Sequence, residues 1–554
     1  MEGPTFWSRL VKTAFTVKHV VARSQEESLV RKLGRWDLTL LGVGASIGAG
    51  IFVLTGIAAK QAGPAVCFSF LLAAAMCVLN ALAYAELSSR FPESGSAYLY
   101  AYLVFGEVVA IVAGVNLLID YHVGAASIAR SLVGYFAQLC KDVHIHLPQF
   151  LVSLPLPSVP FLSLSLLAPL ILLAITMVLV RGVQESSSVS NALTVLKIFI
   201  VLLVIGAGVT VSDSKNLTPF APKGANGVIE ASALVFFAYI GFDAVSNTAE
   251  ECVQPQRDLP FGIIASLLVC ATLYMGVTLV LCSVVPYEKI DEDAPLTTAF
   301  KGHGMHWIEL VVDMGAVIGL STTLLVGLYS QARIYLGIAR DGLLPKRLAA
   351  VDPKSGTPVM AQMVCFVVAG ALALFFDVKR LSSVLSIGIM FAYTTVCAAV
   401  LYLRVAPVEK PILTPLLSLV GAFALASGFC SRYKAPLIVM YMCSGMAVLT
   451  LTMLCCRLNF KAPTNENVFA CPWVPLLPSL GVAFNLFMMA QLAWEAWVRL
   501  AVVTVIVLCA YAWKVWGDDP NSKVEGDSDS PTTAPLLGTQ NTYGSTERGV
   551  GGLN

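Results

Sequence analysis

The sequence contains few charged residues. Only 12% of its 554 positions are Asp, Glu, Lys or Arg, about half of the roughly 25% that is usual in soluble proteins. The 35 basic and 34 acidic side chains leave a net charge of +1, so no excess of positive charge is available to bind nucleic acid. Hydrophobic residues make up 57% of the chain and the mean hydropathy is +0.78. A polytopic membrane protein is therefore expected, rather than a soluble enzyme, a disordered scaffold or a nucleic-acid-binding protein.

Several motifs of energy conversion and catalysis are also missing. No Gly-Lys dipeptide occurs, which excludes a P-loop and disfavours an ATP-driven pump. The fourteen cysteines form no CxxC pair, the histidines form no HExxH motif, and no cofactor or metal site is expected. The segment 44–48 matches the G-x-S-x-G pattern of a serine hydrolase, but it lies in a membrane span instead of a strand-to-helix turn. The chain is therefore not expected to be an enzyme.

Apolar runs separated by polar or Pro/Gly breaks predict about fourteen transmembrane helices. They are expected near 38–59, 65–88, 101–124, 165–180, 188–211, 228–249, 261–285, 307–338, 359–376, 383–404, 412–430, 435–456, 472–494 and 498–516. With a cytoplasmic amino terminus, the inner segments carry more Lys and Arg than the outer loops. Both termini are therefore expected in the cytoplasm.

Two predicted spans are interrupted by residues that weaken a helix. The first contains four glycines within nine positions, at 42, 44, 48 and 50, and the sixth contains Gly241 and Asp243. Unwound backbone at membrane depth is tolerated only where it lines a cavity or binds something, because each unpaired N–H or C=O is costly in hydrocarbon. An alternative is that the glycines serve close helix packing, as in Gly44-xxx-Gly48.

The spacing of the two breaks favours a binding site. The two spans begin 190 residues and five spans apart, so the second half is inserted upside down relative to the first. Broken helices at matching positions of inverted halves predict a substrate site at the membrane midplane. Free N–H groups of a half-helix suit a carboxylate and free carbonyls suit an ammonium. The pair therefore predicts a site for an α-amino acid.

Several motifs resemble those of the amino acid–polyamine–organocation superfamily. They are GASIGAGIFVLTG (44–56), AGP (62–64), AYAELSSRFPESGSAYLYAY (83–102), FFAYIGFDAVSNTAEE (236–251), QPQRDLPFGI (254–263) and ARDGLLP (339–345). Fourteen spans and the string LLIDYHVGAASIAR (117–130) resemble its cationic amino acid transporter branch, particularly plant-like members. The resemblance covers roughly residues 30–515, and its motifs are specific for the family but much less so for the substrate.

The resemblance implies an all-α, LeuT-like fold with a 5+5 inverted-repeat core and four additional C-terminal helices. The expected divisions are a cytoplasmic segment at 1–37, the transport core at 38–404, the additional helices at 405–516 and a disordered cytoplasmic tail at 517–554.

The resemblance also implies a set of substrate contacts. The substrate carboxylate is expected on backbone amides of Ser46, Ile47, Gly48, Ala49 and Gly50. The ammonium is expected to face backbone carbonyls of Phe237, Ala238 and Ile240. The Phe237 ring matches the aromatic gate of the family, and the alternative is an ordinary packed side chain.

Lys197 is the only basic residue well inside a predicted span, where a charge without a partner is costly. It matches a lysine that occupies the sodium position in proton-coupled relatives, so it could gain and lose a proton during transport. The alternative is that it snorkels to the cytoplasmic interface. Candidate hydroxyl partners on the eighth span are Ser321, Thr322 and Thr323, unless they bond to their own helix.

Two acids complete the list of candidate residues. Asp120, on the third span, matches a family position near the substrate side chain. It could be the counter-charge for a cationic amino acid, a cap of the pocket or a structural group. Asp243 belongs to the GFD motif and could gate the site or link the broken sixth helix to its surroundings.

The expected function is secondary active transport of amino acids, cationic ones such as arginine and lysine or neutral ones, by proton-coupled alternating access. A channel is disfavoured because it would need a continuous polar pore. The main alternative is a transporter-like sensor that binds an amino acid and signals with little transport. The expected partners are the amino acid, protons and membrane lipid, with oligomeric state and accessory subunits open, and the expected location is the vacuolar or plasma membrane.

Overall fold

The computed structural model describes residues 6–18, 31–52, 54–142, 144–145, 147–155, 162–181, 187–291, 294–353, 355–463 and 468–517. Within these residues, ten helices are long and apolar enough to cross a membrane, and four shorter apolar helices accompany them. The strands described are β1 (Leu154–Pro155) and β2 (Ser163–Leu164), a short antiparallel pair. The prediction of an all-α polytopic membrane protein is confirmed. The predicted disordered tail lies outside the described residues from position 518 onward.

Each of the fourteen predicted spans corresponds to a helix or to a broken helix. In chain order these are α2 (Arg35–Ser46) with α3 (Ala49–Phe52) and α4 (Leu54–Ala62), α5 (Val66–Arg90), α7 (Glu107–Asp142), α9 (Leu167–Val180), α10 (Ser187–Thr210), α11 (Gly224–Val235) with η4 (Phe236–Tyr239) and α12 (Phe242–Asn247), α13 (Pro255–Val284), α15 (His306–Arg340), α16 (Val359–Phe375), α18 (Ile387–Arg404), α19 (Lys410–Arg432), α20 (Leu437–Arg457), α21 (Leu476–Gln491) and α22 (Trp494–Gly517). Shorter helices are α1 (Phe6–Ala14), α6 (Ser96–Phe105), α8 (Gln149–Val152), α14 (Pro295–Lys301) and α17 (Val378–Ser383). Single turns of 3₁₀ helix are η2 (Gly63–Ala65), η3 (Ser214–Leu217), η5 (Ala249–Glu251), η6 (Tyr287–Lys289), η7 (Lys346–Ala349) and η8 (Pro407–Glu409).

The third span is longer than its hydropathy predicts. The predicted end at 124 is wrong, because α7 continues to Asp142. The helix passes through Arg130, whose polarity interrupts the apolar pattern. Arg130 is only 7% exposed, and its guanidinium donates to the carbonyl oxygens of Phe376, at 2.7 Å, and Ser163. Since these partners compensate the buried charge, the helix tolerates it.

Helices at matching positions of the two halves contact each other. The broken α2 contacts the broken α12, α5 contacts α13, and α7 contacts α15. These pairs join spans one and six, two and seven, and three and eight. They bring the two interrupted helices together in the interior of the bundle, as the inverted-repeat prediction requires.

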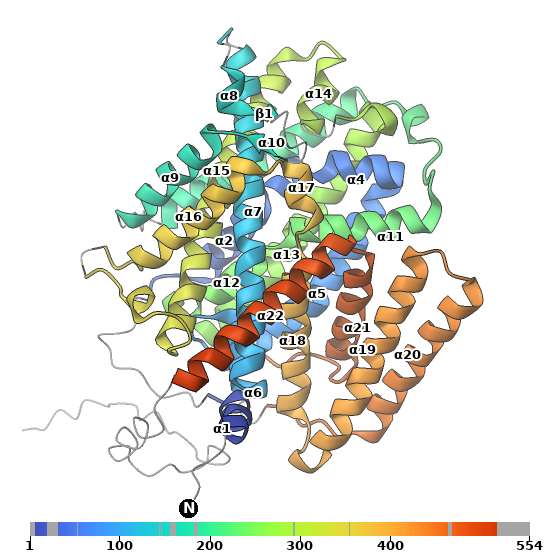
Figure 1. Ribbon diagram of the computed structural model, residues 1–554. Helices are drawn as coiled ribbons and strands as arrows, with labels where there is room; N and C mark the ends of the chain where they lie inside the picture. Colours follow the sequence, from blue (N-terminus) through green and yellow to red (C-terminus); the bar gives the residue numbers. More distant parts are fainter. Residues whose placement is uncertain are drawn as a thin grey trace, which may run out of the picture.

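The C-terminal helices pack against the outside of this core (Figure 1). The helices α19, α20 and α21 form a group at one side, and α21 packs against α18 and α5. The last helix, α22, crosses α7 diagonally and contacts it. The final helix is therefore placed beside the third span of the core.

A buried ion pair joins α5 to α18. Glu86 has no exposed surface, and its carboxylate accepts hydrogen bonds from Nε (2.9 Å) and a terminal guanidinium nitrogen (2.6 Å) of Arg404. The backbone N–H of Cys471 donates a further bond of 2.9 Å to the same carboxylate. Both charges are thus compensated, and the pair ties the loop before α21 to the core.

Candidate functional site

The first break interrupts the first span between Ser46 and Ala49. The helix α2 ends at Ser46, and Ile47 leaves the helix in an extended conformation with φ −73° and ψ 92°. The N–H of Ile47 still donates to the carbonyl of Val43 at 2.9 Å, so this amide is already occupied. The carbonyl oxygens of Gly44 and Ile47 have lost their helical partners to the break and accept bonds from other helices instead.

Lys197 reaches these carbonyls from α10. Its side chain is 1% exposed, and Nζ lies 2.8 Å from the Gly44 oxygen and 3.2 Å from the Ile47 oxygen. Thr323 Oγ1, from α15, donates to the same two oxygens at 3.0 and 2.9 Å and lies 3.3 Å from Nζ. The ammonium therefore ends at the break, buried among the helices.

The other two hydroxyl candidates on α15 do not join this cluster in the described structure. Thr322 bonds back to Ile318 and Gly319 of its own helix, both at 3.0 Å. Of the three predicted hydroxyls Ser321, Thr322 and Thr323, the structure brings only Thr323 to Lys197 within the part of the chain that it describes.

The second break separates α11 from α12. After the turn η4, Ile240 is extended and Gly241 has φ +156°, a conformation that side chains rarely adopt. The N–H of Gly241 donates to Asp243 Oδ1 at 3.1 Å, and the Tyr121 hydroxyl of α7 donates to Oδ2. Asp243 thus caps the start of α12 and links the break to the third span.

The two breaks touch each other. A Cβ atom on Gly50 would lie 2.3 Å from Cβ of Ala238, and one on Gly241 would lie 2.3 Å from Oγ of Ser46. The Tyr274 hydroxyl, from α13, bonds to the carbonyls of Ser46 (2.7 Å) and Ala238 (3.0 Å). Tyr274 was not predicted, because a tyrosine in an apolar run carries no signal of the two carbonyls that it bridges.

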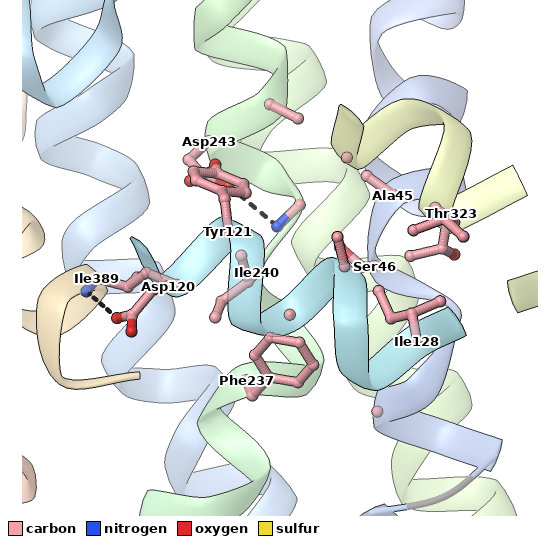
Figure 2. A pocket seen from close by; sticks show the side chains of 17 residues that line it. Ala45, Ser46, Asp120, Tyr121, Ile128, Phe237, Ile240, Asp243, Thr323 and Ile389 are labelled. Atoms are coloured by element: carbon pink, nitrogen blue, oxygen red, sulfur yellow. Dashed lines mark hydrogen bonds between the residues drawn. The ribbon is translucent and has the colours of Figure 1, made fainter. Parts of the chain in front are cut away.

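A cavity of about 50 Å³ lies between the breaks (Figure 2). Its wall is formed by both breaks together with α7, α15 and α18. Seven of the predicted site residues line it, namely Ser46, Gly50, Asp120, Phe237, Ile240, Asp243 and Thr323. Predicted residues that are not among the lining residues are Ile47, Gly48, Ala238, Lys197, Ser321 and Thr322. Ala49 is the first residue of α3.

The carbonyls expected to receive an ammonium are partly occupied. The Phe237 oxygen accepts the N–H of Ile240 at 3.1 Å, and the Ala238 oxygen accepts Tyr274. The ring of Phe237 projects over the cavity, and it lies 3.2 Å from where a Cβ on Gly124 of α7 would stand. Glycine at position 124 therefore leaves room for the ring.

Asp120 faces the cavity from α7 but is already ion-paired. It has no exposed surface, and Oδ2 accepts the backbone N–H of Ile389 at 2.8 Å, as Figure 2 shows. Oδ1 forms an ion pair with Arg499 of α22. Arg499 was not predicted as a site residue. It lies at the edge of the last predicted span, where a basic residue is interpreted as a charge of the adjoining loop.

Comparison with known proteins finds matches over most of the chain. The family model described as amino acid permease matches residues 33–431, and the model of the C-terminus of that family matches 469–516. The chain is 46% identical to cationic amino acid transporter 9, chloroplastic, of Arabidopsis thaliana, over 89% of each chain. It is 36% identical to a branched-chain amino acid permease of Bacillus subtilis, over 92% of this chain and 97% of the relative. It is 32% identical to cationic amino acid transporter 4, vacuolar, of A. thaliana, over 88% and 92%.

Proposed function

The chain belongs to the amino acid permease family of amino acid transporters, and from that premise we propose that it couples transport to protons through Lys197. The observation that carries this proposal is the position of the Lys197 ammonium, 2.8 Å from Gly44 O and 3.2 Å from Ile47 O at the break of the first span. A protonated amine donates to both carbonyls, and loss of its proton removes the charge that holds them. Protonation of Lys197 is thereby linked to the conformation of the first break.

The break in turn forms part of the cavity wall. Ser46 and Gly50 flank Ile47 and Gly48, and both line the cavity. A change in the break therefore alters the space in which a substrate lies. This connection is the physical route by which a proton on α10 and an amino acid in the cavity affect each other's binding, as reciprocal coupling requires.

The proposed substrate is an α-amino acid with free carboxylate and ammonium groups. The carboxylate is assigned to the backbone amides of 46–50 other than that of Ile47, which donates to Val43. The ammonium is assigned to the carbonyls of Phe237, Ala238 and Ile240, as in the resemblance stated above. Phe237 is proposed to close over the bound substrate, with Gly124 providing the space opposite its ring. The relatives' names include both cationic and branched-chain amino acids, so they support either class of side chain.

The proposed orientation places both termini on the cytoplasmic side of the vacuolar or plasma membrane. The relatives' names mention chloroplast and vacuole, so a vacuolar membrane is supported by some of them and a chloroplast membrane by another. A fluorescent fusion viewed beside markers of these three membranes decides between them.

Uptake into proteoliposomes tests the proposed function. Purified protein should accumulate radiolabelled amino acid when a proton gradient, acidic outside, is imposed, and a protonophore should abolish the accumulation. Binding of amino acid without uptake would support a transporter-like sensor instead. Uptake that is indifferent to the gradient would contradict proton coupling.

A further inference from the structure

We propose that Arg499 determines the substrate class: by pairing with Asp120 it makes that side of the cavity electrically neutral, so uncharged amino acids are preferred over lysine and arginine. This inference rests on the proposed function, in which the cavity between the breaks holds the amino acid. It assigns a selectivity role to a residue of α22, a helix that lies outside the ten-span core.

The pair is buried, and Asp120 is the partner of Arg499 among the described residues. Asp120 lines the cavity and has no exposed surface, whereas the Arg499 side chain is 13% exposed and approaches from behind α7. Apart from the ion pair, the guanidinium nitrogens of Arg499 have no hydrogen-bond partner among the described residues. If a substrate binds to Asp120 instead, Arg499 therefore has no other acceptor among the described residues.

A cationic substrate would need that same carboxylate. Asp120 and Asp243 are the acids that line the cavity in the described structure. Both oxygens of Asp243 already accept bonds, from Gly241 and Tyr121, that hold the second break. A lysine or arginine side chain would thus have to displace Arg499 and leave a guanidinium buried without a counter-charge, which is strongly unfavourable.

An uncharged side chain meets no such cost. The remaining wall includes the apolar side chains of Ile128, Ile240, Leu324 and Ile389. Burial of an aliphatic side chain against them is favourable, and the Asp120–Arg499 pair stays intact. The cavity therefore favours neutral amino acids.

Competition in proteoliposomes tests this inference. Uptake of radiolabelled leucine is measured with unlabelled leucine, lysine or arginine as competitor, for the wild type, Arg499→Gln, and Asp120→Asn/Arg499→Gln. Arg457→Gln, an exposed arginine at the end of α20, is the matched control. Thermal stability of each purified variant is recorded in parallel.

The wild type and the control should bind leucine at least tenfold more tightly than lysine. Arg499→Gln leaves Asp120 uncompensated, so the ratio of lysine to leucine affinity should rise at least tenfold. The double variant removes both charges and should return to the neutral preference.

The inference is overturned if the wild type prefers lysine, or if a folded Arg499→Gln shows an unchanged ratio. If Arg499→Gln does not fold, a wild-type preference for lysine still overturns the inference, and the double variant tests the contribution of the pair. If no amino acid is bound or taken up by the wild type, the proposed function fails, and that outcome is distinct from a wild type that takes up lysine in preference to leucine.

Discussion

Lys197 Nζ donates a 2.8 Å hydrogen bond to the carbonyl oxygen of Gly44, and so joins the middle of α10 to the break of the first span. The two residues are 153 positions apart in the sequence. The broken helix needs a donor for its freed carbonyl, and the buried ammonium needs an acceptor. Thr323 completes the arrangement by donating to the same oxygen at 3.0 Å.

Replacing Thr323 by Val should weaken transport. The change keeps the shape of the side chain but removes the hydroxyl that bonds to Gly44 and Ile47. Loss of a buried donor costs about 1–3 kcal/mol, so we expect the initial rate of gradient-driven uptake to fall by about tenfold. Thr322→Val is the control, because the Thr322 hydroxyl bonds only to its own helix in the described structure. Equal rates for the two variants would show that the hydroxyl of Thr323 has no part in the break.

Adding a methyl group at Gly50 should disturb the contact between the two breaks. The new Cβ of Gly50→Ala would lie 2.4 Å from the backbone Cα of Ala238, and overpacking of this kind costs about 1–3 kcal/mol. We expect a lower melting temperature and loss of most substrate binding. Ala238→Gly in the same chain should restore part of both. Gly134→Ala is the control, since nothing lies within 4 Å of that added Cβ. Wild-type binding by Gly50→Ala would mean that the breaks separate freely.

Breaking the ion pair between α5 and α18 should destabilise the protein. Arg404→Met leaves the carboxylate of Glu86 buried without its counter-charge, which costs about 3–5 kcal/mol. We expect a large fall in the melting temperature of the purified protein. Adding Glu86→Gln should recover part of the loss, because the uncompensated charge is removed. Arg457→Met, at an exposed position, should have little effect. A melting temperature for Arg404→Met equal to that of the control would rule out a stabilising role for the pair.

The spans and the two breaks were predictable because local sequence patterns indicate them. A membrane helix needs a run of apolar residues, and four glycines in nine positions weaken the first span wherever it packs. The end of the third span was not predictable in this way. Arg130 reads as a loop residue, and the carbonyl of Phe376 that satisfies it lies 246 positions away.

The candidate site was predictable in part, for the same reason. Ser46, Gly50, Phe237 and Ile240 sit in the breaks themselves, and the structure brings them to one cavity. Lys197 stood out because a charge is rare in a span. Contacts between distant spans were not predictable, because no local sequence pattern indicates them. Tyr274 bridges both breaks, and Arg499 neutralises Asp120 from the last helix. Asp120 was predicted as one candidate counter-charge for the substrate, but no sequence pattern indicated that Arg499 is its partner.

Proton coupling through Lys197 is tested most directly by comparing two kinds of transport in the variant Lys197→Met. Met is close in size to Lys but carries no proton, so it cannot link protonation to the break. We predict that Lys197→Met still exchanges labelled for unlabelled amino acid across proteoliposomes, but no longer accumulates amino acid when a proton gradient is imposed. Gradient-driven accumulation by Lys197→Met at the wild-type level would contradict the role of Lys197.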